Sequence, residues 1–285
     1  KLDVILVKQK IKQWAAMPKD KDGGATYLMC PNLYWHRLNQ LFSPNMENYK
    51  LVEQPHKETL EHLQDGLSYL DASWGKTDLN GTLPYVYLLP KEKDPTNEDR
   101  PIMSYFHHPQ KGKLKKAGRA LMWMLKLLQH EHLAKGFAVF DTPAHVKEMA
   151  TSTLPPNTSV YLGDVKNMYT NIEHSNLIHT IDWVIKTFTG HFGNKTIFVP
   201  NAKTASVSWG DQANPKAQGT TLDLSTLRTV LHFDVRNTFF TLGNKVMKRT
   251  LGIPMGSPCS PAFAVAVCIK AEHDFVSTNP HTCHT

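Results

Sequence analysis

A single carboxylate in the segment YLGDVKNMYTNI, residues 161–172, is the first candidate for chemistry in this chain. Asp164 follows an apolar run and precedes the aromatic residue Tyr169 by five positions. Carboxylate oxygens are the ligands that magnesium prefers. An isolated Asp, however, more commonly caps a helix or pairs with a basic side chain. Asp164 alone therefore does not define a site, and the neighbouring motifs must decide its role.

Two other segments carry residues suited to phosphate contacts or to a close approach of the backbone. Lys91 and Arg100 flank the polar part of PYVYLLPKEKDPTNEDRPIMSYF, residues 84–106. The planar fork of Arg suits phosphate oxygens, although a charged hairpin tip is usually only solvated. The segment GIPMGSPCSP, residues 252–261, combines glycines, which permit close backbone approach, with prolines, which stiffen the chain.

The elements around these motifs predict an α+β fold. Apolar residues at helical spacing predict helices, and short β-rich runs around turns predict hairpins at 84–106 and 235–252. Residues 160–165 predict a strand that leads to Asp164, whereas residues 189–225 lack periodicity and are interpreted as an insertion or long connection. The helices are expected at 1–17, 56–70, 111–136, 173–188 and 260–275.

Composition points to a polyanionic partner inside the cell. Lys and Arg number 32 against 25 Asp and Glu, which gives a net charge of +7. The four cysteines form no C-x-x-C pair, which is typical of reduced thiols in an intracellular protein. Because no run of 18 apolar residues occurs, we expect no membrane span. The first residue is Lys, which indicates a processed chain or a part of a longer one.

Taken together, LPKEKDPTNEDRPI, DVKNMYTNI and GIPMGSPCSP resemble the polymerase core of reverse transcriptases, in particular those of Penelope-like retroelements, which are relatives of telomerase. The resemblance covers residues 84–275 in order and spacing. It implies the fingers and part of the palm of a right-hand polymerase, preceded by a helical extension. The implied divisions are an extension at 1–83, a fingers-like region at 84–150 and a partial palm at 151–285 with the insertion at 189–225.

The resemblance also assigns roles to individual residues. It implies that Asp164 is a catalytic magnesium ligand, that the Val165 carbonyl is a helper, and that Tyr169 is a gate under the nucleotide sugar. A ring at that position would collide with a 2′-hydroxyl, so the implied product is DNA. Lys91 and Arg100 match positions that hold the incoming triphosphate. The implied contacts to template and primer are Gly252, Pro254, Met255, Gly256, Ser257 and Pro258.

Some positions depart from the family pattern. Asp94 stands where a basic residue is common, Lys248 and Arg249 stand where Gln is common, and Val265 replaces an Asn. These departures affect the fine contacts to phosphate and template rather than the fold.

A second acidic motif is missing. Nucleotidyl transfer uses two divalent ions about 3.5–4 Å apart, yet the chain has no Asp-Asp pair, and its only acids after Cys259 are Glu272 and Asp274. The chain alone is therefore expected to be inactive, its two-ion magnesium site incomplete. It is either a part of a longer enzyme, half of a site completed by a second chain, or a non-catalytic RNA-binding or structural subunit of a large ribonucleoprotein such as a ribosome. The expected partners are an RNA template with a nucleic-acid primer, or a structural RNA, in a mitochondrial or nuclear compartment.

Overall fold

The computed structural model describes residues 10, 12–18, 26–43, 47–70, 72–153, 158–159, 161–214 and 216–280. The chain divides into two compact units. The first unit is formed by the described residues of Lys1–Lys113 and Arg236–Pro258, and the second by those of Leu114–Val235 and Cys259–Thr285.

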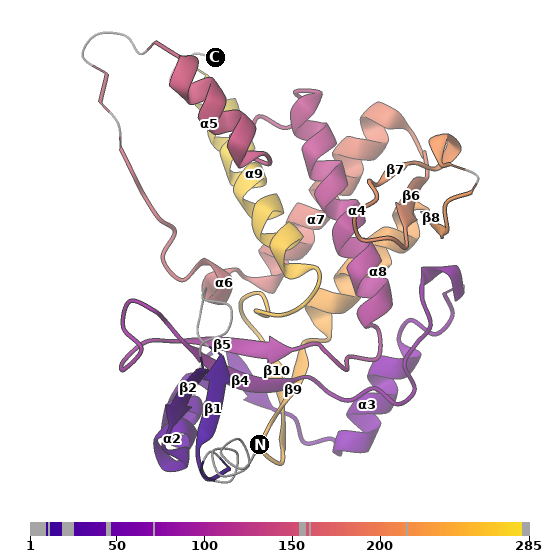
Figure 1. The fold of residues 1–285 in the computed structure, drawn as a ribbon. Coiled ribbons are helices and arrows are strands. Elements are labelled where there is room, and N and C mark those ends of the chain that lie inside the picture. Colours follow the sequence, from indigo (N-terminus) through magenta and orange to yellow (C-terminus); the bar gives the residue numbers. More distant parts are fainter. Residues whose placement is uncertain are drawn as a thin grey trace, which may run out of the picture. The chain divides into compact units, whose positions relative to one another are not determined.

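Two hairpins that are far apart in the sequence meet in one five-stranded sheet of the first unit (Figure 1). One hairpin joins β4 (Tyr85–Pro90) to β5 (Asp99–Ser104), and the other joins β9 (Phe239–Leu242) to β10 (Lys245–Arg249). The sheet order is β3–β10–β9–β4–β5, where β3 is Tyr49–Leu51 and β4 pairs with β9 in parallel. Both hairpins predicted from the sequence are confirmed.

The core of the first unit lies where this sheet meets the N-terminal elements. Phe42, Tyr49 and Phe240 form an aromatic cluster with ring centroids 5.1–5.6 Å apart, and all three are almost fully buried. Alternation along β4 and β5 buries Leu88 and Met103 completely. The N-terminal elements are β1 (Ala15–Pro18), β2 (Thr26–Met29), α2 (Pro31–Phe42), α3 (His56–Asp65) and the 3-10 helix η1 (Ala72–Trp74).

The helix expected over residues 1–17 is wrong at its C-terminal end, and residues 1–9 and 11 lie outside the described part. Ala15–Pro18 forms β1, which pairs antiparallel with β2 and buries Met17. Pairing with a strand ten residues later overrides the helical preference of the two alanines here. The extension predicted as helical therefore also contains the three short strands β1, β2 and β3.

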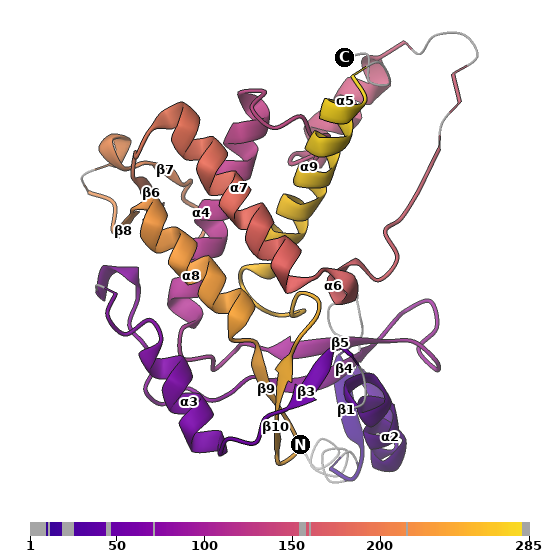
Figure 2. The same ribbon diagram turned by 180° about the vertical axis from the view of Figure 1, so that it is seen from behind.

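Helices form most of the second unit (Figure 2). Their shared core consists of Leu and Met side chains of α4, apolar side chains of α7 and α8, and the Ala- and Phe-rich face of α9. The predicted helices over 111–136, 173–188 and 260–275 are confirmed as α4, α7 and α9, with α4 beginning in the first unit. The helices are α4 (Lys111–His130), α5 (Thr142–Thr151), α6 (Met168–Asn171), α7 (His174–Phe192), α8 (Leu224–Arg236) and α9 (Ser260–Thr278).

Residues 189–225 contain more regular structure than their composition predicted. They form the three-stranded antiparallel sheet β7–β6–β8, with β6 at Ile197–Pro200, β7 at Ser208–Trp209 and β8 at Gly219–Leu222, and the 3-10 helix η2 at Gly210–Gln212. The segment interpreted as an insertion or long connection therefore contains regular structure, and its status as an insertion stays a prediction. The apolar β6 is only four residues long and becomes a strand because two partners bury it on both sides.

The strand expected at 160–165 is also not formed over residues 161–165, and residue 160 lies outside the described part. Residues 161–165 have no regular secondary structure, and the side chains of Tyr161 and Leu162 are 90% and 97% exposed. None of the described strands pairs with this segment. Without a partner its backbone cannot complete a ladder, so the apolar pattern alone did not produce a strand.

No described helix is long and apolar enough to cross a membrane.

Candidate functional site

The loop that follows β10 is held against the edge strand β5. The Met103 amide donates a hydrogen bond of 2.9 Å to the Met255 carbonyl, across the edge of the sheet. Gly256 has φ +140°, and a Cβ atom built there would lie 1.9 Å from the Met103 carbonyl oxygen. Only glycine fits so close an approach at this φ. The structure thus joins the GIPMGSPCSP segment to β5, the strand that contains the RPI segment.

The rest of this loop is compact. Gly252 also has a positive φ, +85°, and its neighbour Ile253 is fully buried. Pro254 is buried, Met255 and Pro258 are half-buried, and the buried Ser257 donates its amide to the Pro254 carbonyl at 3.3 Å. The residues predicted to contact template and primer therefore form one turn, in which Gly256 alone is exposed.

Arg249 supports this turn from inside the unit. Its Nε donates a hydrogen bond of 2.6 Å to the Leu251 carbonyl, and its guanidinium lies 5.5 Å from the centre of the Tyr49 ring. The side chain is fully buried, and burial lowers its pKa. Arg249, a departure from the family pattern in the sequence, is thus a structural residue beneath the loop. Its position three residues before the first loop glycine, Gly252, is the only sequence signal for this role.

The predicted triphosphate contacts lie on the β4–β5 hairpin of the same unit. Lys91 follows β4, its Nζ pairs with the Glu98 carboxylate at 2.8 Å, and its amide donates to the Glu98 carbonyl. Arg100 is half-buried on β5, where it lies opposite Leu89. Both partners of the Lys91 pair are well exposed, so this ion pair contributes at most about 1 kcal/mol.

A buried ion pair fixes the base of this hairpin. The Arg37 Nε lies 2.7 Å from the Asp99 carboxylate, and an Arg37 amino group donates to the Pro95 carbonyl at 3.1 Å. Burial raises the pKa of Asp99, and the Arg37 charge opposes that rise. Arg37 therefore connects α2 to the hairpin that carries Lys91 and Arg100.

Asp164, Val165 and Tyr169 lie in the second unit. Asp164 and Val165 are exposed in the irregular segment before α6. Asn167, with a left-handed φ of +54°, turns the chain into α6, which carries Tyr169. Tyr169 is half-buried, and burial raises the pKa of its phenol with a smaller contribution from Cys268 on α9. The chain between Asp164 and Tyr169 thus bends at Asn167, whose backbone is in the left-handed conformation.

Asp164 by itself does not form a two-metal site. Within the described ranges, no three His, Cys, Asp or Glu side chains come together as a metal-binding group. The Asp164 carboxylate and the neighbouring Val165 carbonyl would supply ligands for one magnesium ion. Two magnesium ions about 3.5–4 Å apart need further carboxylates. The residues present fit one part of a magnesium site and not the whole of it.

The basic first half of α4 packs within the protein. Lys113 is buried, and its ammonium donates to the Leu67 carbonyl, to the Thr77 hydroxyl and to the Gln110 side-chain oxygen at 2.8–3.0 Å. Further along α4, Arg119 donates to the Pro200 and Ala205 carbonyls of the small sheet region. The spacing of Lys113 from Ala117 and Ala120 places it on the apolar face of the helix, which is a signal present in the sequence.

Comparisons with known proteins agree with a polymerase-like fold. No protein-family model matches the chain, and no curated protein matches it in sequence. Solved structures of telomerase from Candida tropicalis do match in fold. The apo enzyme has a TM-score of 0.58 at 13% identity over 94% of this chain and 43% of its own. A form truncated from its C-terminal domain has a TM-score of 0.59 at 13% identity, over 98% and 51%.

A third match is the same telomerase in complex with the TWJ fragment of telomeric RNA, with a TM-score of 0.58 at 15% identity over 95% of this chain and 41% of that one. The chain therefore spans about two fifths to one half of the telomerase chains it matches. The predicted α+β class is confirmed, and the fold is similar to that of these telomerase structures, consistent with the predicted polymerase fingers and partial palm.

Proposed function

We propose that this chain is the fingers and first palm portion of an RNA-directed DNA polymerase. The observation that carries the proposal is the fold, which follows telomerase over 94–98% of the chain. The contact between Gly256 and Met103 adds support, because it brings together two segments whose motifs resemble reverse transcriptases. The Penelope-like relationship within that class stays a prediction from the motifs.

In this proposal, the residues of the second unit act on the incoming nucleotide and its metal. Asp164 and the Val165 carbonyl would hold one magnesium ion, which when bound neutralises phosphate charge. The Tyr169 ring excludes a 2′-hydroxyl from the sugar site. Since one carboxylate does not complete a two-metal site, the activity requires a second acidic segment from a longer form of the protein or from a second chain.

The residues of the first unit would act on phosphate and template. Lys91 exchanges Glu98 for a triphosphate oxygen, and Arg100 donates to a second oxygen. The turn from Gly252 to Pro258 packs against the template and primer, because its glycines leave the backbone open to close approach. RNA template and nucleic-acid primer are the proposed partners, in the nucleus or in mitochondria.

The alternative is a non-catalytic RNA-binding or structural subunit that retains the reverse-transcriptase fold. Two observations favour it: the incomplete acidic site and the net charge of +7. Under this alternative the same surfaces bind structural RNA in a large ribonucleoprotein. RNA affinity does not separate the two functions, since both predict it.

Primer extension separates them. The native polypeptide isolated from its source, first characterised by intact mass, is given an RNA template, a DNA primer, deoxynucleotides and Mg²⁺. We expect extension by that protein, alone or with its companion chain. Asp164→Asn should lower the rate about 100-fold or more, as expected for loss of several kcal/mol of charge stabilisation. Asp211→Asn, an exposed Asp of the same unit, is the matched control.

The outcomes are distinct. Extension that survives Asp164→Asn would contradict the assigned role of this residue. Absence of extension by the native protein, with RNA binding retained, would favour the structural subunit. Tyr169→Ala adds a specific readout, because removal of the ring should let ribonucleotides enter the product.

A further inference from the structure

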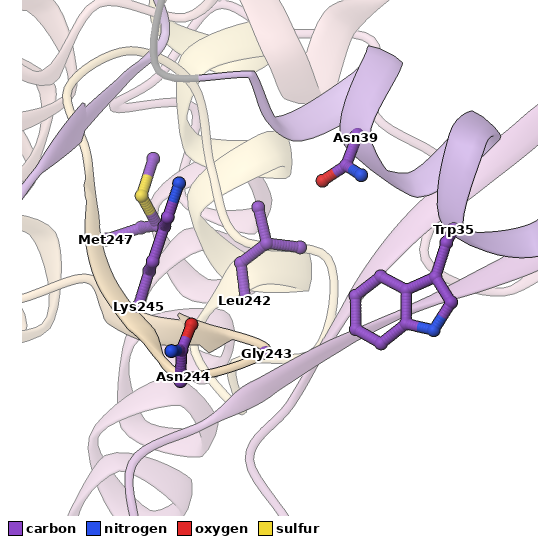
Figure 3. A pocket seen from close by; sticks show the side chains of 7 residues that line it. All are labelled: Trp35, Asn39, Leu242, Gly243, Asn244, Lys245 and Met247. Atoms are coloured by element: carbon purple, nitrogen blue, oxygen red, sulfur yellow. The ribbon is translucent and has the colours of Figure 1, made fainter.

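We propose that a pocket beside the β9–β10 turn binds one unpaired nucleotide of a single-stranded RNA. The pocket has a volume of about 250 Å³ and lies within the first unit, between α2 and the hairpin (Figure 3). Figure 3 shows Trp35 and Asn39 on α2 facing the hairpin residues. None of the positions assigned from the sequence motifs lines it.

The floor of the pocket is apolar and its rim is polar. Leu242 and Met247 form the floor and are 6% and 0% exposed. The rim carries exposed side chains of Asn39, Asn244 and Lys245. An apolar floor with a few convergent polar groups is the usual composition of a small-ligand site.

Trp35 supplies a surface on which a base can stack. Its indole is 45% exposed although it sits on a helix beside buried neighbours. Gly243 has a φ of +61°, which favours glycine in this turn, and the turn lies against the ring: a Cβ atom built there would be in ordinary contact with the edge of the indole at 3.6 Å. Exposed aromatic faces beside a basic groove are the platforms on which proteins hold single-stranded nucleic acid.

The charge around the pocket suits a phosphate backbone. Pro31–Phe42 contains no Asp or Glu, and residues 235–271, which include the whole β9–β10 hairpin, contain none either. Among the cations of α2 and the hairpin, Arg37 and Arg249 are buried and bonded within the unit, whereas Lys248 is half-buried and Lys245 is exposed. Lys245 is the exposed cation that lines the pocket, so its ammonium is placed for the phosphate of a bound nucleotide.

Size and sugar chemistry narrow the ligand further. Sites for drug-sized molecules measure about 300–1,000 Å³, so this smaller pocket has room for one base. The amides of Asn39 and Asn244 offer both donors and acceptors, which suit a base edge or a 2′-hydroxyl. The choice of RNA over DNA rests on the proposed function, in which RNA is the templating strand.

The test is a binding titration of the full chain with a fluorescein-labelled RNA of ten nucleotides, followed by anisotropy between 50 and 200 mM salt. Stacking of one base makes Trp35→Ala bind about 5- to 100-fold more weakly. Trp35→Phe, which keeps a stacking ring, should recover most of that loss. Lys245→Gln should reduce the salt slope by about 0.7, the value for one contact to a single strand.

Matched controls come from the same unit. Tyr69 is 67% exposed, and Lys57 pairs only weakly with Glu61 on the surface of α3. Tyr69→Ala and Lys57→Gln should bind RNA like the unmodified chain. Thermal unfolding of each variant verifies that Trp35→Ala remains folded.

Three outcomes would overturn the assignment. The first is unchanged RNA affinity in Trp35→Ala, and the second is tighter binding of DNA of the same sequence, which would assign the pocket to a primer. The third is full displacement of the RNA by ATP at comparable concentration, which would make it a free-nucleotide site. Primer extension that depends on Asp164, together with unchanged affinity in Trp35→Ala, would refute the pocket and leave the proposed function intact. RNA binding that depends on Trp35, without primer extension, would refute the proposed function and leave the pocket assignment intact.

Discussion

Replacement of Gly256 by Ala should destabilise the first unit by about 2–5 kcal/mol. A backbone conformation that side chains rarely adopt costs about 1–3 kcal/mol, and here φ is +140°. The new Cβ would also lie 1.9 Å from the Met103 carbonyl oxygen, which is backbone and must move with β5. That movement weakens the 2.9 Å hydrogen bond from the Met103 amide to the Met255 carbonyl. A buried donor left unsatisfied costs a further 1–3 kcal/mol or so.

Chemical and thermal unfolding followed by circular dichroism measure this effect. For a unit of this size each kcal/mol lowers the melting temperature by roughly 2–4 °C, so a decrease of about 4–20 °C is expected. Gly112→Ala is the matched control, because that Cβ would meet only Gly75 at 4.0 Å on the exposed first turn of α4. If Gly256→Ala unfolds within about 0.5 kcal/mol of the unmodified protein, the close contact between the loop and β5 is wrong.

Three further predictions concern buried or paired charges. Burial lowers the pKa of His108 to about 3. Between pH 6.5 and 3 the unfolded chain therefore binds a proton at this residue that the folded chain does not, and the free energy of unfolding should fall as the pH decreases. In urea unfolding measured across this range, His108→Gln should make that decrease smaller. Lys113→Ala removes three hydrogen bonds from a buried ammonium and should cost about 2–4 kcal/mol, whereas the exposed Lys57→Ala should cost less than about 0.5 kcal/mol in the same denaturation assay. Hydrogen bonds from Arg228 lower the pKa of Asp182, so the carboxylate stabilises the fold above its usual pKa, and this contribution is lost as the pH falls through the lowered value. Asp182→Asn should lower the free energy of unfolding by at most about 1 kcal/mol at pH 7, because the pair is partly exposed. A larger decrease at pH 3 than at pH 7 would contradict this.

The Asp182 pair also links α7 to α8. Arg228 on α8 donates two hydrogen bonds of 2.7 Å to the carboxylate of Asp182 on α7, and His232 lies 2.7 Å from the same carboxylate. Asp182 and Arg228 are 46 positions apart in the sequence, so no local pattern identified this pair.

Local sequence patterns determined the elements whose stability depends on near neighbours. The helices α4, α7 and α9 follow from apolar spacing along a single segment, and the two hairpins follow from short apolar runs around polar or glycine-containing turns. Gly256 also belongs here, because a glycine between Met and Ser in a proline-rich turn already indicated close backbone approach. The α+β class and the polymerase-like fold were accessible from these features and from three short motifs.

Tertiary structure decided the features that depend on partners far away in the chain. The apolar residues 161–165 form no strand because no described strand pairs with them, whereas Ala15–Pro18 forms one because β2 does. The contacts of Lys113 with the Leu67 carbonyl and the Thr77 hydroxyl, and the packing of Arg249 beside the Tyr49 ring, likewise depend on segments far away in the chain. Trp35 and Lys245 meet at one pocket only because α2 packs beside a hairpin some 200 residues later. Pairing and burial are properties of two surfaces at once, and a single sequence segment specifies only one of them.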